Sequence, residues 1–223
     1  HVDGAHGASL CLSNQFKYLI HGIERANSVV WDAHKMMMMP ALCTGVLFKK
    51  YSDSFKVIQH KAPYLYDDKS KDMTKDWYNV SKRTIECTKN PMCFKIYTSL
   101  KVHGEELFSA YVTQTLLNAR KLSRMIKVTQ GLELALEPES NIVCFRFNPK
   151  NLSEKKLNCL QTKIRQEIVT STNYYIVKTV LKGTTYLRTT LMNPLTSEDD
   201  MQHLVKEIQR IGISLSHQPE VSQ

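Results

Sequence analysis

The sequence predicts an α/β unit followed by a smaller α+β unit, and two patterns in the order of its segments support this. In the first part, residues 28–31 and 44–48 are short apolar runs without polar alternation, typical of strands buried on both faces of a sheet. Residues 16–23, before the first of these runs, predict a crossover helix that ends near Gly22. After Gly104 the expected order is helix, two strands, helix, hairpin and helix, which is the order of an α+β unit.

Gly104 marks the expected boundary between the two units. It gives one domain of residues 1–103 and another of residues 104–223, with helical patterns expected on both sides of the glycine. Residues 64–82 have no hydrophobic period and many charges, which predicts a long mobile loop. Long loops in compact domains often act as functional lids.

The second unit carries the clearest signals for individual elements. Its last helix is expected to begin at Ser197, because serine is a favoured N-cap and the three acidic residues that follow suit the positive first turn. The helix is expected to stop at Gly212. Ser153 is the expected cap of the preceding helix. The remaining strands are expected over 132–136, 142–147, 174–181 and 185–192.

Composition excludes several classes of protein. The 223 residues are 42% hydrophobic and 23% charged, and no apolar run approaches the ~20 residues that a membrane span requires. The net charge of +9 is compatible with anionic partners, but the signs alternate over 67–76 and no nucleic-acid-binding motif is present. We therefore expect neither a nucleic-acid nor a membrane partner. The six cysteines lack zinc-ligand spacing, so we expect no metal. The first residues do not have the pattern of a signal peptide, so we expect reduced thiols in a cytoplasmic protein.

Two short clusters carry the residues suited to chemistry. One is His1-Val2-Asp3-Gly4-Ala5, which places a carboxylate and small residues at the end of a strand, and the other is Asp32-Ala33-His34-Lys35. Taken singly, a strand-end aspartate is usually a cap or turn former, and a His-Lys pair in a loop usually lies at the surface. Together they offer what pyridoxal phosphate needs: an amine for a Schiff base and a carboxylate that keeps the ring nitrogen protonated.

The two clusters resemble the group II pyridoxal-phosphate-dependent amino-acid decarboxylases. This family includes glutamate, cysteine-sulfinate, aromatic amino-acid and diaminobutyrate decarboxylases. The resemblance continues through His21-Gly22-Ile23-Glu24-Arg25-Ala26-Asn27-Ser28, Tyr64-Leu65, Glu86-Cys87-Thr88-Lys89, Leu187-Arg188 and Asn193-Pro194. Cysteine desulfurases carry similar D-G-A and H-K motifs, but the step from Asp3 to Lys35 is longer here, which suits the decarboxylases better.

The resemblance implies an aspartate-aminotransferase-like fold (fold type I), comprising the C-terminal part of a large domain and a small α+β domain. It implies a cytoplasmic homodimer, with the active site at the subunit interface, that removes CO2 from an acidic or other small polar L-amino acid. The implied catalytic residues are Lys35, which forms the Schiff base, and His34. The implied cofactor contacts are Asp3 at the ring nitrogen, Ala5 against the ring, His34 and Asp32, and Arg188 is the implied contact for a substrate carboxylate. In the alternative interpretation, Arg188 is a solvent-facing strand residue.

Some features depart from the family pattern. Asp32 adds a negative charge near a phosphate, and His6 stands where an aromatic residue is common. The chain begins like the middle of a sequence, so we expect a fragment that lacks the upstream ring-stacking and phosphate-binding residues. Two alternatives therefore stay open: a non-catalytic relic of this fold, and another fold type I lyase such as a desulfurase-like or transaminase-like enzyme.

The expected loop also departs from the family. In the family, a tyrosine in the middle of a mobile loop helps to protonate Cα. Residues 69–75 contain no tyrosine, and only Tyr66 and Tyr78 flank them, so we expect the proton donor to be displaced or absent. The run of four methionines after Lys35 is expected to pack behind this lysine.

Overall fold

The chain divides into two compact units, residues 1–110 and 111–223, each with its own core. The computed structural model of the chain describes residues 1–58, 64 and 78–217. Helix α2 (Cys93–Val128) passes from the first unit into the second, and Gly104 within it has non-helical dihedral angles (φ 72°, ψ 179°). The expected boundary at Gly104 therefore coincides with a kink in α2, and the division between the units lies a little further along the chain.

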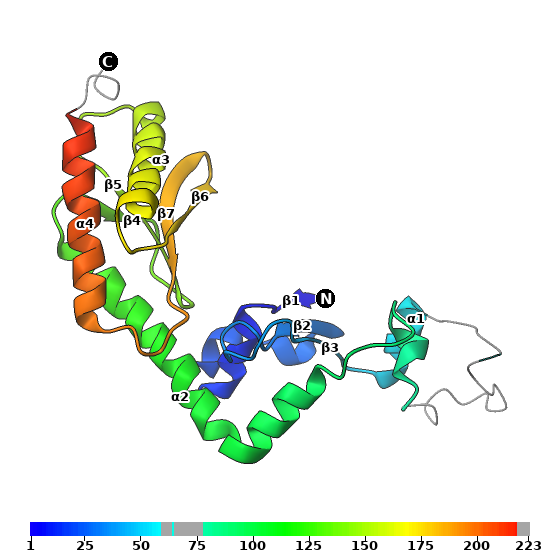
Figure 1. Cartoon of the computed structure of the whole chain (residues 1–223). Coiled ribbons are helices and arrows are strands. Elements are labelled where there is room, and N and C mark those ends of the chain that lie inside the picture. Colours follow the sequence, from blue (N-terminus) through cyan, green and yellow to red (C-terminus); the bar gives the residue numbers. More distant parts are fainter. Residues whose placement is uncertain (59–63, 65–77, 218–223) are drawn as a thin grey trace. The chain divides into compact units, whose positions relative to one another are not determined.

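A three-stranded sheet forms the centre of the first unit. Its strands are β1 (Val2–Asp3), β2 (Ser28–Asp32) and β3 (Thr44–Phe48), with β2 in the middle (Figure 1). Strand β1 runs parallel to β2, and β3 runs antiparallel to it. The strands expected over 28–31 and 44–48 are confirmed, and the second has the expected bounds.

The exposure of β3 differs from the expectation. Val46 and Leu47 are neighbours and so point to opposite faces of the sheet, yet they are 52% and 54% exposed. Burial of this strand on both faces is therefore wrong for the part of the chain that the structure describes, because neither of its faces is covered there.

The connection between β1 and β2 is not the expected crossover helix. It consists of three short 3-10 turns, η1 (Gly7–Leu12), η2 (Lys17–Ile20) and η3 (Ile23–Arg25). Gly22 separates the last two in the left-handed region (φ 98°), which stops a right-handed helix. Phe16 is fully buried while Tyr18 is exposed, so the apolar residues of this segment anchor separate turns rather than one helical stripe.

The second unit is a four-stranded antiparallel sheet with helices. The strands are β4 (Leu132–Leu134), β5 (Ile142–Phe147), β6 (Val177–Leu181) and β7 (Thr184–Thr190), in the order β4-β5-β7-β6. Helices α3 (Glu154–Ser171) and α4 (Glu198–Ser216) pack with one face of this sheet in a shared core (Figure 1). The expected α+β order is confirmed.

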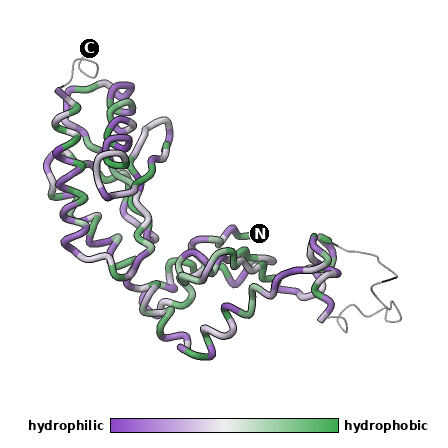
Figure 2. The backbone as a smooth tube through the Cα atoms, in the orientation of Figure 1, coloured by the Kyte–Doolittle hydropathy of each residue, from purple (hydrophilic) through white to green (hydrophobic). Residues whose placement is uncertain are grey.

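Helix α4 begins as expected but ends later. The Ser197 Oγ accepts the backbone N–H of Asp200 at 3.1 Å, and Asp200 accepts the backbone N–H of Ser197 at 2.9 Å, which is a capping box. Figure 2 shows hydrophobic and hydrophilic residues alternating along this helix, as its amphipathic pattern requires. Ser153 takes the N-cap position of α3, but its side chain makes no capping hydrogen bond.

Gly212 does not stop α4, which continues to Ser216. A Cβ at position 212 would lie 2.6 Å from ring atoms of Phe147, so this glycine lets the helix approach the β5 side chain closely. The glycine expected to end the helix is instead a packing residue inside it. No helix among the described residues combines the length and apolar character that crossing a bilayer requires.

Candidate active site

Lys35 lies in the turn that follows β2. Its backbone N–H donates to the carbonyl of Asp32 at 3.1 Å, and its carbonyl accepts the N–H of Met38 at 2.9 Å. Met36, Met37 and Met39 are buried, as expected for packing behind the lysine, whereas Met38 is 48% exposed. The turn leaves the side chain of Lys35 37% exposed, so that it is accessible to a ligand.

Asp32 lies at the end of β2 with both carboxylate oxygens engaged. Its Oδ2 lies 2.9 Å from the Nζ of Lys35, and its Oδ1 accepts the hydroxyl of Thr44 at 2.7 Å. Burial acts to raise the pKa of Asp32, but the hydrogen bonds from Lys35 and Thr44 outweigh it, so the pKa is lowered. Asp32 is therefore a shielded and ionised carboxylate beside the lysine amine.

His34 is held against the start of β3. The backbone N–H of Cys43 lies 3.1 Å from the His34 Nδ1 and can donate to it. The same Nδ1 lies 3.0 Å from the carbonyl oxygen of Cys43, and the Nε2 lies 3.8 Å from the Asp32 Oδ2. Burial raises the pKa of the Cys43 thiol, which marks it as a packing residue.

The first motif joins the second through the parallel pairing of β1 and β2. Asp3 pairs in register with Val30, and the carbonyl of Ala5 accepts the backbone N–H of Asp32 at 3.1 Å. The Asp3 Oδ1 accepts the N–H of Ala5 at 3.1 Å, which fixes this exposed carboxylate at the end of its strand. The carboxyl ends of two parallel strands thus place Asp3, Ala5 and Asp32 at one sheet edge.

Gly4 keeps this edge compact. A Cβ at Gly4 would lie 2.8 Å from the Cβ of Ala8 and 3.0 Å from the carbonyl oxygen of Val30, so a larger residue would push β1 away from β2. The small residues of the first motif are therefore required by the packing of the strands as well as suited to a ligand above them.

Arg188 belongs to the second unit. It lies on β7 in register with Cys144 and Val177, on the face opposite to the buried Leu187, and it is partly buried. Burial raises the pKa of the Cys144 thiol, and the charge of Arg188 acts in the opposite direction. The role of Arg188 as a substrate contact stays a prediction.

The sequence did not predict the part played by Thr44. Its hydroxyl reaches Asp32 because the two residues are register partners across β2 and β3. The sequence does show a polar residue, Thr44, at the first position of the expected strand 44–48. Its partner could be assigned only once the register between the two strands was known.

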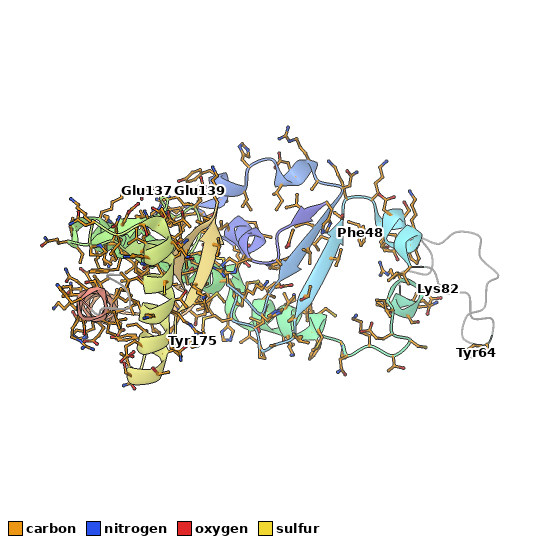
Figure 3. All side chains as sticks on the ribbon, turned by 90° about the horizontal axis from the view of Figure 1, so that it is seen from above. Phe48, Tyr64, Lys82, Glu137, Glu139 and Tyr175 are labelled. Carbon is orange, nitrogen blue, oxygen red and sulfur yellow. The ribbon has the colours of Figure 1, made fainter. Side chains whose placement is uncertain are left out.

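The expected loop and its tyrosines are only partly described. Figure 3 labels Tyr64 and Lys82, the first and last residues of the expected loop. Tyr66 lies outside the described residues, and Tyr78 is 62% exposed. The expectation about the proton donor therefore stays a prediction.

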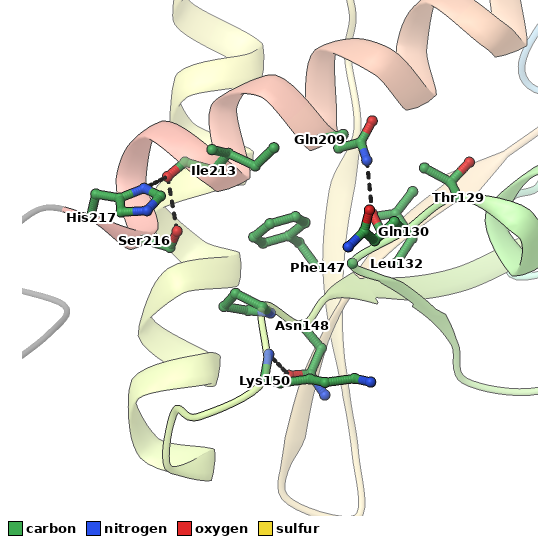
Figure 4. Close-up of a pocket in the computed structure, with 12 residues that line it drawn as sticks. Thr129, Gln130, Leu132, Phe147, Asn148, Lys150, Gln209, Ile213, Ser216 and His217 are labelled. Atoms are coloured by element: carbon green, nitrogen blue, oxygen red, sulfur yellow. Dashed lines mark hydrogen bonds between the residues drawn. The ribbon is translucent and has the colours of Figure 1, made fainter.

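A cavity of about 590 Å³ lies in the second unit, lined by Phe147, Lys150, Gln209 and His217 among others (Figure 4). None of the expected site residues lines it. It is therefore not part of the candidate active site. Within the described ranges, no group of three or more His, Cys, Asp or Glu residues could hold a metal ion.

The conserved domain of the pyridoxal-dependent decarboxylases matches residues 1–148. The chain therefore belongs to the pyridoxal-dependent decarboxylase family, whose cofactor is pyridoxal phosphate. It is 31% identical to the acidic amino acid decarboxylase of Mus musculus over 95% of this chain and 40% of that protein. It is 29% identical to the cysteine sulfinic acid decarboxylase of Mus musculus over 96% of this chain and 45% of that protein. The chain thus spans less than half the length of these relatives.

Solved structures show the same fold. The crystal structure of mouse CSAD matches with a TM-score of 0.82 and 25% identity, over 95% of this chain and 45% of that one. Oryza sativa TDC, solved with PLP and tryptamine, matches with a TM-score of 0.86 over 96% of this chain and 44% of that one, at 17% identity. The fold type I architecture expected from the resemblance is confirmed.

Proposed function

We propose that the protein containing this chain removes the α-carboxylate of an acidic L-amino acid as CO2 and releases the amine, with pyridoxal phosphate as cofactor. Family membership supports the reaction class. The names of two relatives, acidic amino acid decarboxylase and cysteine sulfinic acid decarboxylase, support a substrate with a second acidic group. We further propose that it works as a cytoplasmic homodimer with the active site at the subunit interface.

One observation carries this proposal: the amine of Lys35 and the carboxylate of Asp3 belong to two motifs that the parallel β1–β2 pairing joins at one edge. The backbone hydrogen bond of 3.1 Å from Asp32 to Ala5 ties the motifs together. A primary amine, a strand-end carboxylate and an imidazole form a donor set that suits an aldehyde, a ring nitrogen and a phosphate. The residues present therefore fit the family's cofactor.

Each residue of the candidate site would have a different role in this reaction. Lys35 would hold the cofactor through its amine, and Asp3 would keep a proton at the ring nitrogen by its negative charge. Pyridoxal phosphate, when bound, supplies the electron sink for the electron pair that the departing CO2 leaves behind. Arg188 would bind a substrate carboxylate with its planar guanidinium, and His34 would orient the lysine end of the site.

The assignment of Lys35 can be tested on the full-length protein loaded with pyridoxal phosphate. Borohydride reduction followed by peptide mapping should place the phosphopyridoxyl group on the peptide that contains Lys35. Replacement of Lys35 by arginine should abolish this label, whereas the control Lys56→Arg should leave it in place. A label that stays after Lys35→Arg would reject the assignment.

The substrate class needs a separate experiment. CO2 release should be compared for aspartate, glutamate, cysteine sulfinate, diaminobutyrate and an aromatic amino acid. We expect the highest kcat/KM among the first three, which carry a second acidic group. A preference for diaminobutyrate or for the aromatic substrate would contradict the acidic class while leaving the reaction intact.

A further inference from the structure

Three ion pairs of the first unit share one sequence spacing but differ in their surroundings. Asp32–Lys35, Asp53–Lys56 and Glu86–Lys89 each join an acidic residue to a lysine three positions later, at 2.9, 2.7 and 3.0 Å. The acidic side chain is 12% exposed in the first pair, 25% in the second and 57% in the third. The pair at the candidate site is therefore the most shielded of the three.

A second contact fixes the carboxylate of the shielded pair. The hydroxyl of Thr44 donates to the Asp32 Oδ1 at 2.7 Å, and the strand register that places Thr44 opposite Asp32 does not involve Lys35. The remaining oxygen, Oδ2, is thereby turned towards the lysine nitrogen. Solvent screens a shielded and oriented carboxylate less than an exposed one.

We propose that Asp32, oriented by Thr44, is a positioning residue that fixes the direction of the Lys35 nitrogen through their ion pair. This inference rests on the proposed function, because it assigns Asp32 a role at the lysine that would hold the cofactor. The other titratable groups nearby are His34, with its Nε2 3.8 Å from the same oxygen, the buried thiol of Cys43 on the β3 side, and Asp3 at the end of β1.

The proposal has a chemical consequence for the lysine. An amine adds to an electrophilic carbon through its lone pair, so a proton on the nitrogen must leave for the solvent before the new bond forms. The contact of this nitrogen with the Asp32 carboxylate must also break before the nitrogen can reach the carbon, which slows the first attack. Asp32 therefore controls how readily Lys35 reacts, without itself touching the reacting carbon.

The test is competitive acetylation of the full chain with trace acetic anhydride at pH 7.5, followed by mass spectrometry of each lysine peptide. The lysine nitrogen forms an amide, acetate leaves and the proton goes to the solvent. Asp32→Asn keeps an acceptor for Thr44 but removes the charge that holds the amine, and it should accelerate the labelling of Lys35 by roughly three- to tenfold. The matched control Asp53→Asn should change the labelling of Lys56 by less than about twofold, because the side chain of Lys56 is 73% exposed.

Thr44 supplies a second pair of variants, in case Asp32→Asn does not fold. Thr44→Val removes the hydroxyl and should accelerate Lys35 labelling by about twofold, because the freed carboxylate turns towards water. Thr44→Ser keeps the donor and should restore the original rate. Labelling of Lys89 in the same digests should stay constant, since a general loosening of the fold would raise the reactivity of both lysines. An unchanged rate at Lys35 in Asp32→Asn, or in a folded Thr44→Val, would overturn the proposal.

A parallel arm separates this inference from the proposed function. Pyridoxal phosphate with cyanoborohydride replaces the anhydride in the same variants. Faster capture at Lys35 in Asp32→Asn supports both the inference and the cofactor role. Faster acetylation without any capture at Lys35 supports the role of Asp32 and counts against Lys35 as the cofactor lysine.

Discussion

At the scale of single residues, two aspartates at strand ends have different environments. Asp3 is exposed and accepts a hydrogen bond from the backbone of Ala5, whereas Asp32 is shielded and bound by Thr44 and Lys35. An exposed carboxylate remains accessible to a cationic group of a ligand. The same type of side chain is thus open to solvent at one strand end and is an internal hydrogen-bond partner at the next.

Replacing Asp3 by asparagine should reduce decarboxylation far more than cofactor binding. The amide removes the charge that keeps the ring nitrogen protonated, and a loss of ~3 pKa units at that nitrogen corresponds to roughly 4 kcal/mol. Turnover should fall by about a thousandfold if the whole effect is felt in the transition state. Steady-state kinetics with a cofactor titration measures both quantities, and Asp53→Asn is the control. Turnover within about threefold of the wild type would show that Asp3 is not the partner of the ring nitrogen.

Arg188→Lys should raise KM or lower kcat for the preferred substrate, by about tenfold or more if a bidentate contact is lost. A lysine ammonium does not reproduce the planar two-donor contact of a guanidinium with a carboxylate. Lys182→Arg, a change in the exposed turn before β7, is the control. Kinetics unchanged on every accepted substrate would identify Arg188 as an ordinary strand residue.

Some of the candidate site could be predicted from the sequence because its residues are contiguous. Asp32, His34 and Lys35 lie in one short motif, and any turn after a strand keeps them close together. Thr44 could not be assigned in the same way, because its contact with Asp32 depends on the register of an antiparallel pair. A shift of one residue would turn the hydroxyl to the other face of the sheet.

At the scale of elements, two glycines that were expected to end helices have different roles. Gly212 was expected to end α4, because glycine is frequent just after a helix. It lies inside α4 because the ring of Phe147 leaves no room for a Cβ there. Gly22 was expected to end a helix, and its left-handed conformation does separate two segments there, although these are short 3-10 turns. A sequence alone does not distinguish these uses.

Gly212→Ala should destabilise the protein, although alanine favours helix. The gain in helix propensity is up to about 1 kcal/mol. The added methyl group would meet buried ring atoms at 2.6 Å, and such overpacking costs about 1–3 kcal/mol. We expect a lower urea midpoint at an unchanged slope. Ser214→Ala, an exposed position of the same helix, is the control and should leave the midpoint unchanged or raise it. A Gly212→Ala variant more stable than this control would refute the packing role.

Ser197→Ala should destabilise α4 at neutral pH, and the effect should shrink in acid. The hydrogen bond from Ser197 lowers the pKa of Asp200, so the carboxylate contributes stability above its unfolded pKa. That contribution is lost as the pH falls through the lower, folded pKa. Urea denaturation of both proteins at neutral and strongly acidic pH measures the difference, and Ser216→Ala is the control. If Ser197→Ala lowered the free energy of unfolding by the same amount at both pH values, the interaction between Ser197 and the Asp200 carboxylate would not contribute to stability.

At the scale of the whole molecule, the two units differ in how complete their cores are. The core of the second unit joins its sheet with residues of α2, α3 and α4. The core of the first unit around Lys35 contains the buried residues Ala33, Met37, Met39, Cys43 and Phe108. The order of elements predicted the fold class of both units. The exposure of β3 could not be predicted, because apolar runs do not show what covers them.

Residues 105–223 should fold without the first unit, since their helices and sheet bury a common core. Circular dichroism with urea denaturation should show a cooperative transition for this fragment. Residues 1–104 serve as the comparison and should show none, because Val46 and Leu47 leave apolar surface open on both faces of β3. A cooperative transition in the shorter fragment, or none in the longer one, would contradict this expectation.

The pairing of β2 with both of its neighbours has a consequence for refolding. Thr44 and Asp32 are separated by 12 positions, whereas His1 and Ser28, which bond across β1 and β2, are separated by 27. Closing the longer loop costs about 0.7 kcal/mol more in chain entropy. The turn with Lys35 is thus the more local half of the site, and its assembly does not need Asp3. In a refolding chain, amide protons of β2 and β3 should become protected from exchange before those of β1. The surroundings of Lys35 should therefore form first, and Asp3 should take its place at the site afterwards.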